Sequence, residues 1–147
     1  MLIYFGIGTN LGDREANLQE ALRLLNERVG EQLVCSSMYR SAPLGFESDN
    51  EFANIVVAYQ TSYSPEDLLR ITQEIEREMG RTQKSVNGVY HDRIIDIDLL
   101  KAFETVGLLG ERLEARGEIL RNSPTLTLPH PRIHERDFVM IPWEEIK

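Results

Sequence analysis

The sequence predicts an α+β fold built on an antiparallel sheet that carries two helices on one face. Two observations lead to this expectation. Short apolar runs and amphipathic helical stretches follow one another as strand, helix, strand, strand, helix, strand. In addition, the run Asp92–Lys101 alternates apolar residues with aspartates, as a strand with one buried face does. The two helices are therefore expected to cover only the apolar side of the sheet.

The first half of the chain contains three predicted strands and one helix. A short apolar strand over Leu2–Ile7 leads into a turn rich in glycine. Asp13 is the expected N-cap of the following helix, in which apolar residues recur at helical spacing until Gly30. A strand, a loop and another strand then follow at Gln32–Tyr39, Ser41–Asn50 and Phe52–Thr61.

The second half begins with a clear helix start, because Ser64 offers a hydroxyl cap and Pro65 suits the first helical position. Gly80 is the expected stop of this helix. The polar stretch Arg81–Arg93 is interpreted as a basic loop, and the strand over Asp92–Lys101 follows it. The pattern over 103–121 does not define regular elements. An extended segment and an apolar stretch are expected at Thr125–Leu128 and Phe138–Trp143.

This order of elements is the split β-α-β arrangement of a ferredoxin-like sheet, with additions toward the C-terminus. The length of 147 residues predicts a single domain over 1–147. In such a sheet each strand buries one parity of side chains and leaves the other parity on the open face. A binding site is therefore expected on the open face.

Composition narrows the possible partners. The formal net charge is −8, from 24 acidic and 16 basic residues, which argues against a broad nucleic-acid surface. The single cysteine, Cys35, permits no internal disulfide and is expected to be inert packing. The pattern contains neither a signal segment nor a membrane span, so a cytoplasmic protein without membrane contact is expected. We expect a monomer or a weak homodimer.

Asp96 and Asp98 are the first candidate site. They project from the same side of the predicted strand, roughly 7 Å apart along the backbone. Carboxylates in this arrangement suit Mg²⁺, which binds oxygen ligands and commonly keeps substrate phosphates in its coordination sphere. The alternative is a solvated polar face on a half-buried strand.

Phe52 and Asn54 are the second candidate site, because they share a side of their strand. An aromatic surface beside an amide suits a planar heterocycle, although an ordinary surface aromatic fits the same pattern. The glycine-rich turn GIGTNLGD resembles a phosphate loop but lacks its Lys-Ser/Thr ending, so turn chemistry is the stronger interpretation.

Cationic side chains gather at two places in this acidic chain. Arg81, Lys84, His91 and Arg93 lie just before the aspartate pair. A second group after the extended segment comprises His130, Arg132, His134 and Arg136. A local reversal of charge beside metal-type carboxylates fits a triphosphate shared between Mg²⁺ and basic side chains. A solvated surface is the simpler alternative.

Taken together, the motifs GIGTNLGDREANL, YRSAPLGFESDNEFANIVV, HDRIIDIDLL and LTLPHPRIHERDFV resemble those of the 6-hydroxymethyl-7,8-dihydropterin pyrophosphokinases of folate biosynthesis. The resemblance covers nearly the whole chain. It implies transfer of pyrophosphate from ATP to the hydroxymethyl group of a reduced pterin, with release of AMP and the use of two Mg²⁺ ions. It implies small-molecule substrates and no nucleic acid.

The resemblance also assigns roles by position. Asp96 and Asp98 match metal ligands and, with Arg81 and Arg93, the catalytic set. The pterin pocket is implied at Ser41, Leu44, Phe52, Asn54 and Phe138. Nucleotide contacts are implied at Gln73, Glu76, Arg81, Lys84, Tyr90, Arg93, His130 and Arg136. The chain departs from the family pattern at Gln83, where some relatives carry a further arginine, and Thr125 is a candidate for replacing another.

Two other classes share this kind of sheet. A palm-type nucleotidyl transferase would release pyrophosphate instead of AMP. A non-catalytic ligand-binding module would bind its ligand without Mg²⁺. The nucleotide product and the dependence of binding on metal separate these classes from a pyrophosphokinase.

Overall fold

The computed structural model describes residues 1–41, 51–80, 85–86, 89–90, 94–107 and 113–147. At 85–86, 89–90, 106–107 and 113–116 only the backbone path is described. The main sheet is antiparallel, in the order β2-β4-β1-β7-β8, and β3 also pairs with β4. Its strands are β1 (Leu2–Thr9), β2 (Gly30–Cys35), β3 (Tyr39–Ser41), β4 (Phe52–Thr61), β7 (Asp96–Gly107) and β8 (Leu113–Glu118).

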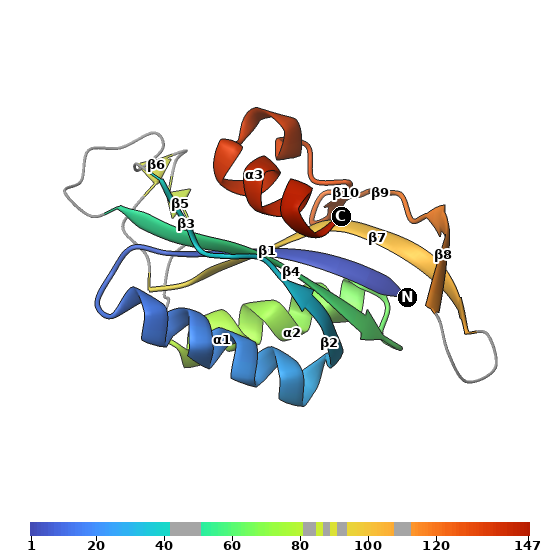
Figure 1. The fold of residues 1–147 in the computed structure, drawn as a ribbon, viewed down its shortest axis with the longest axis horizontal. Coiled ribbons are helices and arrows are strands. Elements are labelled where there is room, and N and C mark those ends of the chain that lie inside the picture. Colours follow the sequence, from blue (N-terminus) through green and yellow to red (C-terminus); the bar gives the residue numbers. More distant parts are fainter. Residues whose placement is uncertain (42–50, 81–84, 87–88, 91–93, 108–112) are drawn as a thin grey trace.

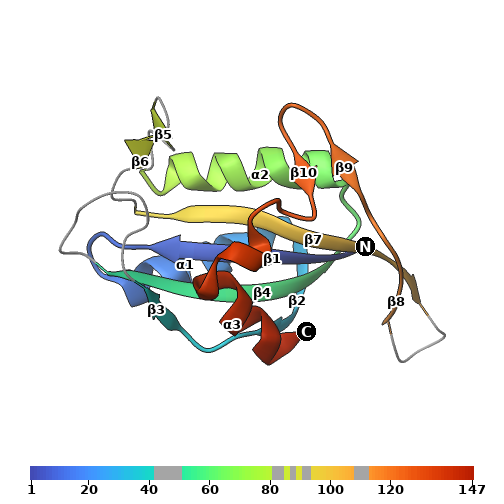
Figure 2. The same ribbon diagram turned by 90° about the horizontal axis from the view of Figure 1, so that it is seen from above.

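Helices cover both faces of this sheet (Figures 1 and 2). The two long helices, α1 (Arg14–Arg28) and α2 (Pro65–Glu78), pack side by side against one face, as predicted. The third helix, α3 (Asp137–Ile146), lies on the opposite face, after the short 3-10 turn Ile133–Glu135. The face expected to be open is therefore covered in part, which leaves the candidate site beside α3.

The starts of α1 and α2 confirm the predicted caps. Asp13 accepts a hydrogen bond from the backbone N–H of Ala16 at 3.1 Å. Ser64 accepts one from the backbone N–H of Asp67 at 3.1 Å, and Pro65 occupies the first helical position. Each cap satisfies a backbone donor that has no partner within its helix.

The main core lies between the sheet and the α1–α2 layer. Ile3, Phe5 and Ile7 of β1 bury their side chains there together with Leu25 of α1 and Leu68 of α2. Residues of the other parity face α3. Tyr4, Val56, Ala58, Leu100, Ile133 and Val139 form this second, smaller cluster. Strand parity therefore divides the sheet between two cores, as a period of two requires.

Several elements differ from the sequence-based expectation. The segment predicted as one strand over 32–39 is two strands, because Ser36 exchanges hydrogen bonds with Val56 and interrupts the ladder. The stretch 103–121, in which the sequence pattern defines no regular elements, contains the last part of β7 and the whole of β8. The predicted basic loop contains the short pair β5 (Ser85–Val86) and β6 (Val89–Tyr90). β10 (Thr127–Leu128) lies within the predicted extended segment Thr125–Leu128, and it pairs with β9 (Arg121–Asn122), which the sequence pattern did not indicate.

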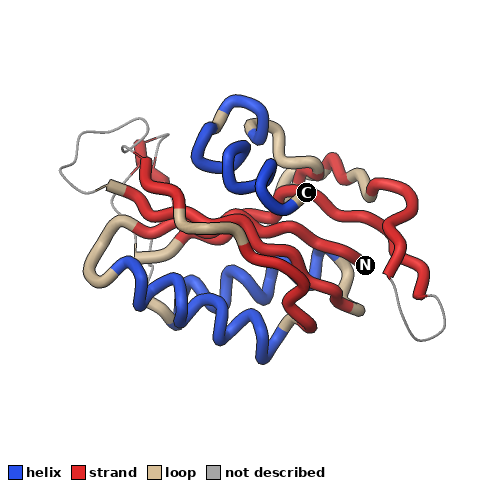
Figure 3. Tube along the Cα trace, in the orientation of Figure 1, coloured by secondary structure: helices blue, strands red, loops and turns tan. Residues whose placement is uncertain are grey.

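The apolar stretch after residue 137 folds as α3, although Pro142 lies inside it. Proline lacks an N–H and disfavours helix interiors, so sequence alone gave no helical signal there. Packing of Val139 against the second core stabilises the helix. The tube representation in Figure 3 shows this helix against the strands, close to the end of the chain.

Candidate active site

The aspartate strand alternates as predicted. Ile95, Ile97 and Leu99 belong to the core under α1 and α2. Asp96 and Asp98 therefore lie on the opposite face of β7, where both are half-buried. The hydrophobic side chains fix the register, because a slip of one residue would move them out of the core.

A bulge ends this alternation at Leu100. Phe5 pairs with Leu99 and Tyr4 pairs with Lys101, so Leu100 has no opposite residue in β1. Leu100 and Lys101 consequently both reach the α3 face, where Lys101 Nζ lies 5.1 Å from the centroid of the Trp143 ring. The bulge thus separates the acidic end of β7 from the part that α3 covers.

The two predicted candidate sites lie in the same row of the sheet. Gly8 of β1 pairs with Asn54 of β4 on one side and with Asp96 of β7 on the other. The next row contains Val56, Gly6 and Asp98. Asn54 and Asp96 are therefore separated by two strand spacings, about 9–10 Å between backbones.

Gly6 and Gly8 leave the strand between these sites without side chains. A Cβ on Gly6 would lie 3.3 Å from the Leu100 side chain, which covers that position. A Cβ on Gly8 would lie 3.0 Å from Asn54 Oδ1 and 3.5 Å from a ring carbon of Phe52. Sequence reasoning placed Gly8 in the turn and missed this role, although glycines two apart in a strand share a face.

Asn54 is fixed in one orientation. Its Nδ2 donates to the backbone oxygen of Tyr39 and to Ser41 Oγ, both at 2.9 Å. Both amide hydrogens are therefore used within the protein, and Oδ1 points to the side of Gly8. A ligand at this position meets a hydrogen-bond acceptor, not the donor and acceptor together that the sequence suggested.

Arg136 connects the acidic pair with the start of α3. Its Nη1 lies 3.8 Å from Asp98 Oδ2, and the guanidinium carbon lies 5.5 Å from the centroid of the Phe138 ring. The Arg136 side chain is 14% exposed. Its Nε is buried and makes no hydrogen bond to any part of the chain that the structure describes. A guanidinium held in this way can donate hydrogen bonds to a phosphate oxygen.

His130 is half-buried and follows the cis peptide bond between Leu128 and Pro129. Its backbone N–H donates to the oxygen of Leu100 at 2.8 Å, which ties it to the bulge. Its Nδ1 accepts a hydrogen bond from the backbone N–H of Arg132 at 3.1 Å. In the neutral ring the hydrogen therefore resides on Nε2.

Glu76 lies on the other side of the sheet. It is 3% exposed, and its Oε2 accepts a hydrogen bond from the backbone N–H of Ile97 at 2.9 Å. This geometry favours support of β7 over contact with a nucleotide. Gln73, one turn earlier on α2, is half-buried. The nucleotide contacts expected at both positions stay predictions.

Several predicted site residues lie outside the described residues, namely Leu44, Arg81, Lys84 and Arg93. Tyr90 belongs to β6, and its side chain also lies outside the described part. Ser41, Phe52 and Phe138 are described and half-buried, with Ser41 at the end of β3 and paired with Phe52.

The donor set fits Mg²⁺ held jointly with substrate. Among the described residues no group of three or more His, Cys, Asp or Glu side chains could hold a metal ion by itself. Asp96 and Asp98 supply two carboxylates on one face. Mg²⁺ commonly binds one or two protein carboxylates when substrate phosphates complete its coordination sphere. The adjacent Arg136 agrees with a polyanion at this place.

The end of α3 is attached to the segment between β2 and β3. Glu145 Oε1 accepts hydrogen bonds from the Ser37 hydroxyl at 2.6 Å and from its backbone N–H at 2.9 Å. These bonds, the hydroxyl first, lower the pKa of Glu145 below its usual value. Burial raises the pKa of the Cys35 thiol, and the Glu145 charge adds to this, in agreement with an unreactive packing cysteine.

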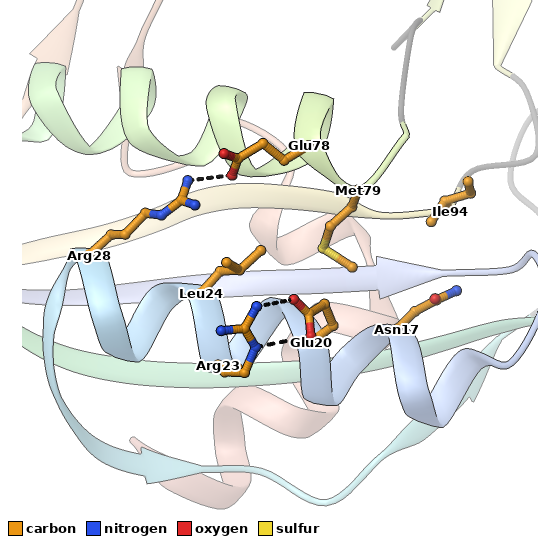
Figure 4. A pocket seen from close by; sticks show the side chains of 8 residues that line it. All are labelled: Asn17, Glu20, Arg23, Leu24, Arg28, Glu78, Met79 and Ile94. Atoms are coloured by element: carbon orange, nitrogen blue, oxygen red, sulfur yellow. Dashed lines mark hydrogen bonds and ion pairs between the residues drawn. The ribbon is translucent and has the colours of Figure 1, made fainter.

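A separate cavity of about 410 Å³ lies on the helix face, between α1 and α2 (Figure 4). Arg23 pairs with Glu20 at 2.6 Å, and Arg28 pairs with Glu78 across the two helices. The charges that line this cavity are therefore matched in pairs. It is not part of the candidate active site, which occupies the opposite face of the sheet.

Comparisons with known proteins find similar sequences along nearly the whole chain. A family model described as 7,8-dihydro-6-hydroxymethylpterin-pyrophosphokinase (HPPK) matches residues 4–147. A 2-amino-4-hydroxy-6-hydroxymethyldihydropteridine pyrophosphokinase of Porphyromonas gingivalis is 46% identical over 147 residues, with 99% of this chain and 90% of that protein covered. A protein of the same name from Bacillus subtilis is 36% identical over 146 residues, covering 99% and 77%.

Solved structures support the fold. HPPK-DHPS crystallised in complex with substrates matches with a TM-score of 0.66 and 16% identity, over 99% of this chain. A triple mutant of HPPK-DHPS from Plasmodium falciparum matches with a TM-score of 0.67 and 14% identity, also over 99% of this chain. This chain spans 40% and 39% of those two chains. Within the described residues, no helix is long and apolar enough to cross a membrane.

Proposed function

The chain belongs to the 7,8-dihydro-6-hydroxymethylpterin-pyrophosphokinase family, and on that premise we propose how its residues transfer pyrophosphate from ATP to the pterin hydroxymethyl group. The observation that carries the proposal is the row Asn54, Gly8, Asp96 on one face of the sheet. In this row Asn54 offers a polar contact to a ring, and Asp96, on the other side of Gly8, suits a metal-bound triphosphate.

In this proposal Asn54 Oδ1 accepts a hydrogen bond from an N–H of the pterin, because its own amide hydrogens are engaged by Tyr39 and Ser41. Phe52 and Phe138 contact the faces of the ring, with backbone around Ser41 and Leu44 completing the pocket. The half-buried positions of both phenylalanines support a role as apolar walls.

Asp96 and Asp98 are proposed to hold two Mg²⁺ ions together with the phosphates of ATP. Bound there, the ions supply charge neutralisation on the transferred group. Arg136 and His130 Nε2 are proposed to bind phosphate oxygens, assisted by Arg81, Lys84 and Arg93, with Tyr90 and Gln73 as further nucleotide contacts. Glu76 acts beneath the sheet, where it holds β7 through Ile97.

The reaction then proceeds by in-line displacement. The pterin hydroxyl oxygen forms a bond to the β-phosphorus while the bond from that phosphorus to the α-phosphate oxygen breaks. The electron pair leaves with AMP, and the hydroxyl proton is released. Positioning on a rigid sheet and stabilisation of negative charge supply the acceleration. We propose that the enzyme works in the cytoplasm as a monomer or a weak homodimer.

The test is an assay with ATP, Mg²⁺ and 6-hydroxymethyl-7,8-dihydropterin, scored for the nucleotide product. Formation of AMP and the pterin diphosphate in equal amounts is expected. Release of free pyrophosphate with the nucleoside monophosphate attached to product would instead identify a nucleotidyl transferase. Binding of the pterin without any turnover would identify a ligand-binding module.

A further inference from the structure

We propose that Gly8 is a specificity-determining residue. Because it has no side chain, the hydroxymethyl group of the substrate can lie against the β1 backbone on its way to the phosphates. This inference rests on the proposed function. It starts from the position of Gly8, which separates the ring contact Asn54 from the acidic position Asp96 within one row of the sheet.

The distance between these positions sets the requirement. Asn54 and Asp96 lie about 9–10 Å apart at the backbone, on either side of β1. A fused ring held at Asn54 carries its alcohol on a single carbon, so the alcohol cannot pass around an intervening side chain. It reaches phosphates held near Asp96 only by passing directly over Gly8.

The environment of Gly8 differs from that of its neighbour Gly6. The Leu100 side chain occupies the space above Gly6, at 3.3 Å from a Cβ placed there. Gly8 is bordered by Asn54 Oδ1 and the Phe52 ring, and it is itself partly exposed on the site face. A methyl group on Gly8 would enter the site, whereas one on Gly6 would press against the buried side chain of Leu100.

This arrangement offers a matched pair of variants on one strand and one face. In Gly8→Ala the Kd of the pterin, measured by fluorescence with a non-hydrolysable ATP analogue and Mg²⁺, is expected to rise about tenfold or more. The turnover of pterin should fall by about a hundredfold, which is the loss that a misplacement of ~1 Å produces. In Gly6→Ala the same Kd should stay within about twofold. Affinity for the ATP analogue should be unchanged in both.

A further variant separates loss of space from displacement of Asn54. Gly8→Ala is placed in an Asn54→Ser background, where the close contact with Oδ1 no longer exists. An additional loss of pterin affinity supports the proposal. No additional loss overturns it, because the effect then acts only through Asn54. Equal losses in the two alanine variants, or a parallel loss of affinity for the ATP analogue, also overturn it.

Folding failure of Gly8→Ala does not block the test. A structure of the wild-type enzyme with pterin and the ATP analogue should place substrate atoms in van der Waals contact with Gly8, at about 3.5–4 Å. Substrate held away from β1 by other groups contradicts the proposal. Wild-type enzyme that makes no AMP would refute the proposed function, whereas active wild type with an unaffected Gly8→Ala variant refutes only this inference.

Discussion

The Glu76 carboxylate accepts a hydrogen bond from the backbone N–H of Ile97, the residue between Asp96 and Asp98. β8 pairs with β7 only from Phe103 onward. Near the aspartates, the Glu76 side chain of α2 therefore accepts the hydrogen bond from the outer edge of β7. A helix on one face of the sheet thereby supports the strand that presents the acidic pair on the other face. The metal-type carboxylates owe part of their fixed position to this buried contact.

Replacement of Glu76 tests this support. Glu76→Ala leaves the Ile97 N–H without this acceptor and should lower the free energy of unfolding by about 1–3 kcal/mol. The melting temperature should fall by about 2–4 °C for each kcal/mol, as measured by calorimetry. Glu76→Gln keeps an acceptor and should be the milder change. Equal stability of Glu76→Ala and the wild type would contradict a structural role.

Loss of an aspartate should remove activity without unfolding the protein. Asp98→Asn weakens the proposed metal site and should reduce AMP formation by about a hundredfold or more. Mn²⁺ binding in the presence of an ATP analogue, followed by electron spin resonance, should weaken in parallel. Asp67→Asn removes an exposed acid of α2 and serves as the control. Near wild-type turnover of Asp98→Asn would refute the metal-ligand role.

Chelation of divalent cations gives a related prediction without any mutation. Addition of EDTA should abolish AMP formation, and added Mg²⁺ should restore it. Without a cation between them, the two carboxylates and the triphosphate carry like charges and repel each other. Persistence of AMP release in excess chelator would exclude the proposed role of Asp96 and Asp98.

Arg136 should bind the nucleotide through its planar, charged guanidinium group. Arg136→Lys keeps a cation but loses both the fork geometry and the stacking on Phe138, so affinity for the ATP analogue should fall. Arg136→Ala should lower turnover further, by about a hundredfold. Arg70→Ala, at an exposed pair on α2, is the matched control. If lysine restored full affinity and turnover, simple charge would explain the residue.

Replacement of Asn54 by aspartate should weaken pterin binding. Asn54→Asp retains an oxygen on the side of Gly8 but sets the other oxygen against the Tyr39 carbonyl, where Nδ2 now donates. The pterin Kd should therefore rise despite the preserved acceptor. Ser41→Ala removes only one of the two hydrogen bonds and should change the Kd less, by about 2–10-fold. Unchanged binding in Asn54→Asp would show that the amide orientation is unimportant.

The attachment of α3 should depend on pH. The pKa of Glu145 is lowered from its ordinary value of 4.5 by the Ser37 hydroxyl and backbone N–H. The stabilisation is therefore fully present above 4.5 and is lost as the pH falls through the lowered value. Glu145→Gln should be less stable than wild type at about pH 7, and the difference should vanish in acid. Denaturant unfolding across pH measures this, and a difference that persists in acid would contradict it.

The sequence determined the local elements and the parity of the site. Capping residues at Asp13 and Ser64 set the starts of both long helices, since these signals act within one turn. Alternation in Asp96–Leu99 assigned the aspartates to one face, because a strand period of two admits no other arrangement.

The tertiary structure alone decided what lies beside those residues. Register between strands distant in sequence brought Asn54, Gly8 and Asp96 into one row, and packing placed α3, despite its internal proline, over the far part of the same face. It also directed Glu76 to Ile97. Such relationships depend on long-range pairing and burial, which local propensity does not encode, so a glycine in a strand became meaningful only once its neighbours were known.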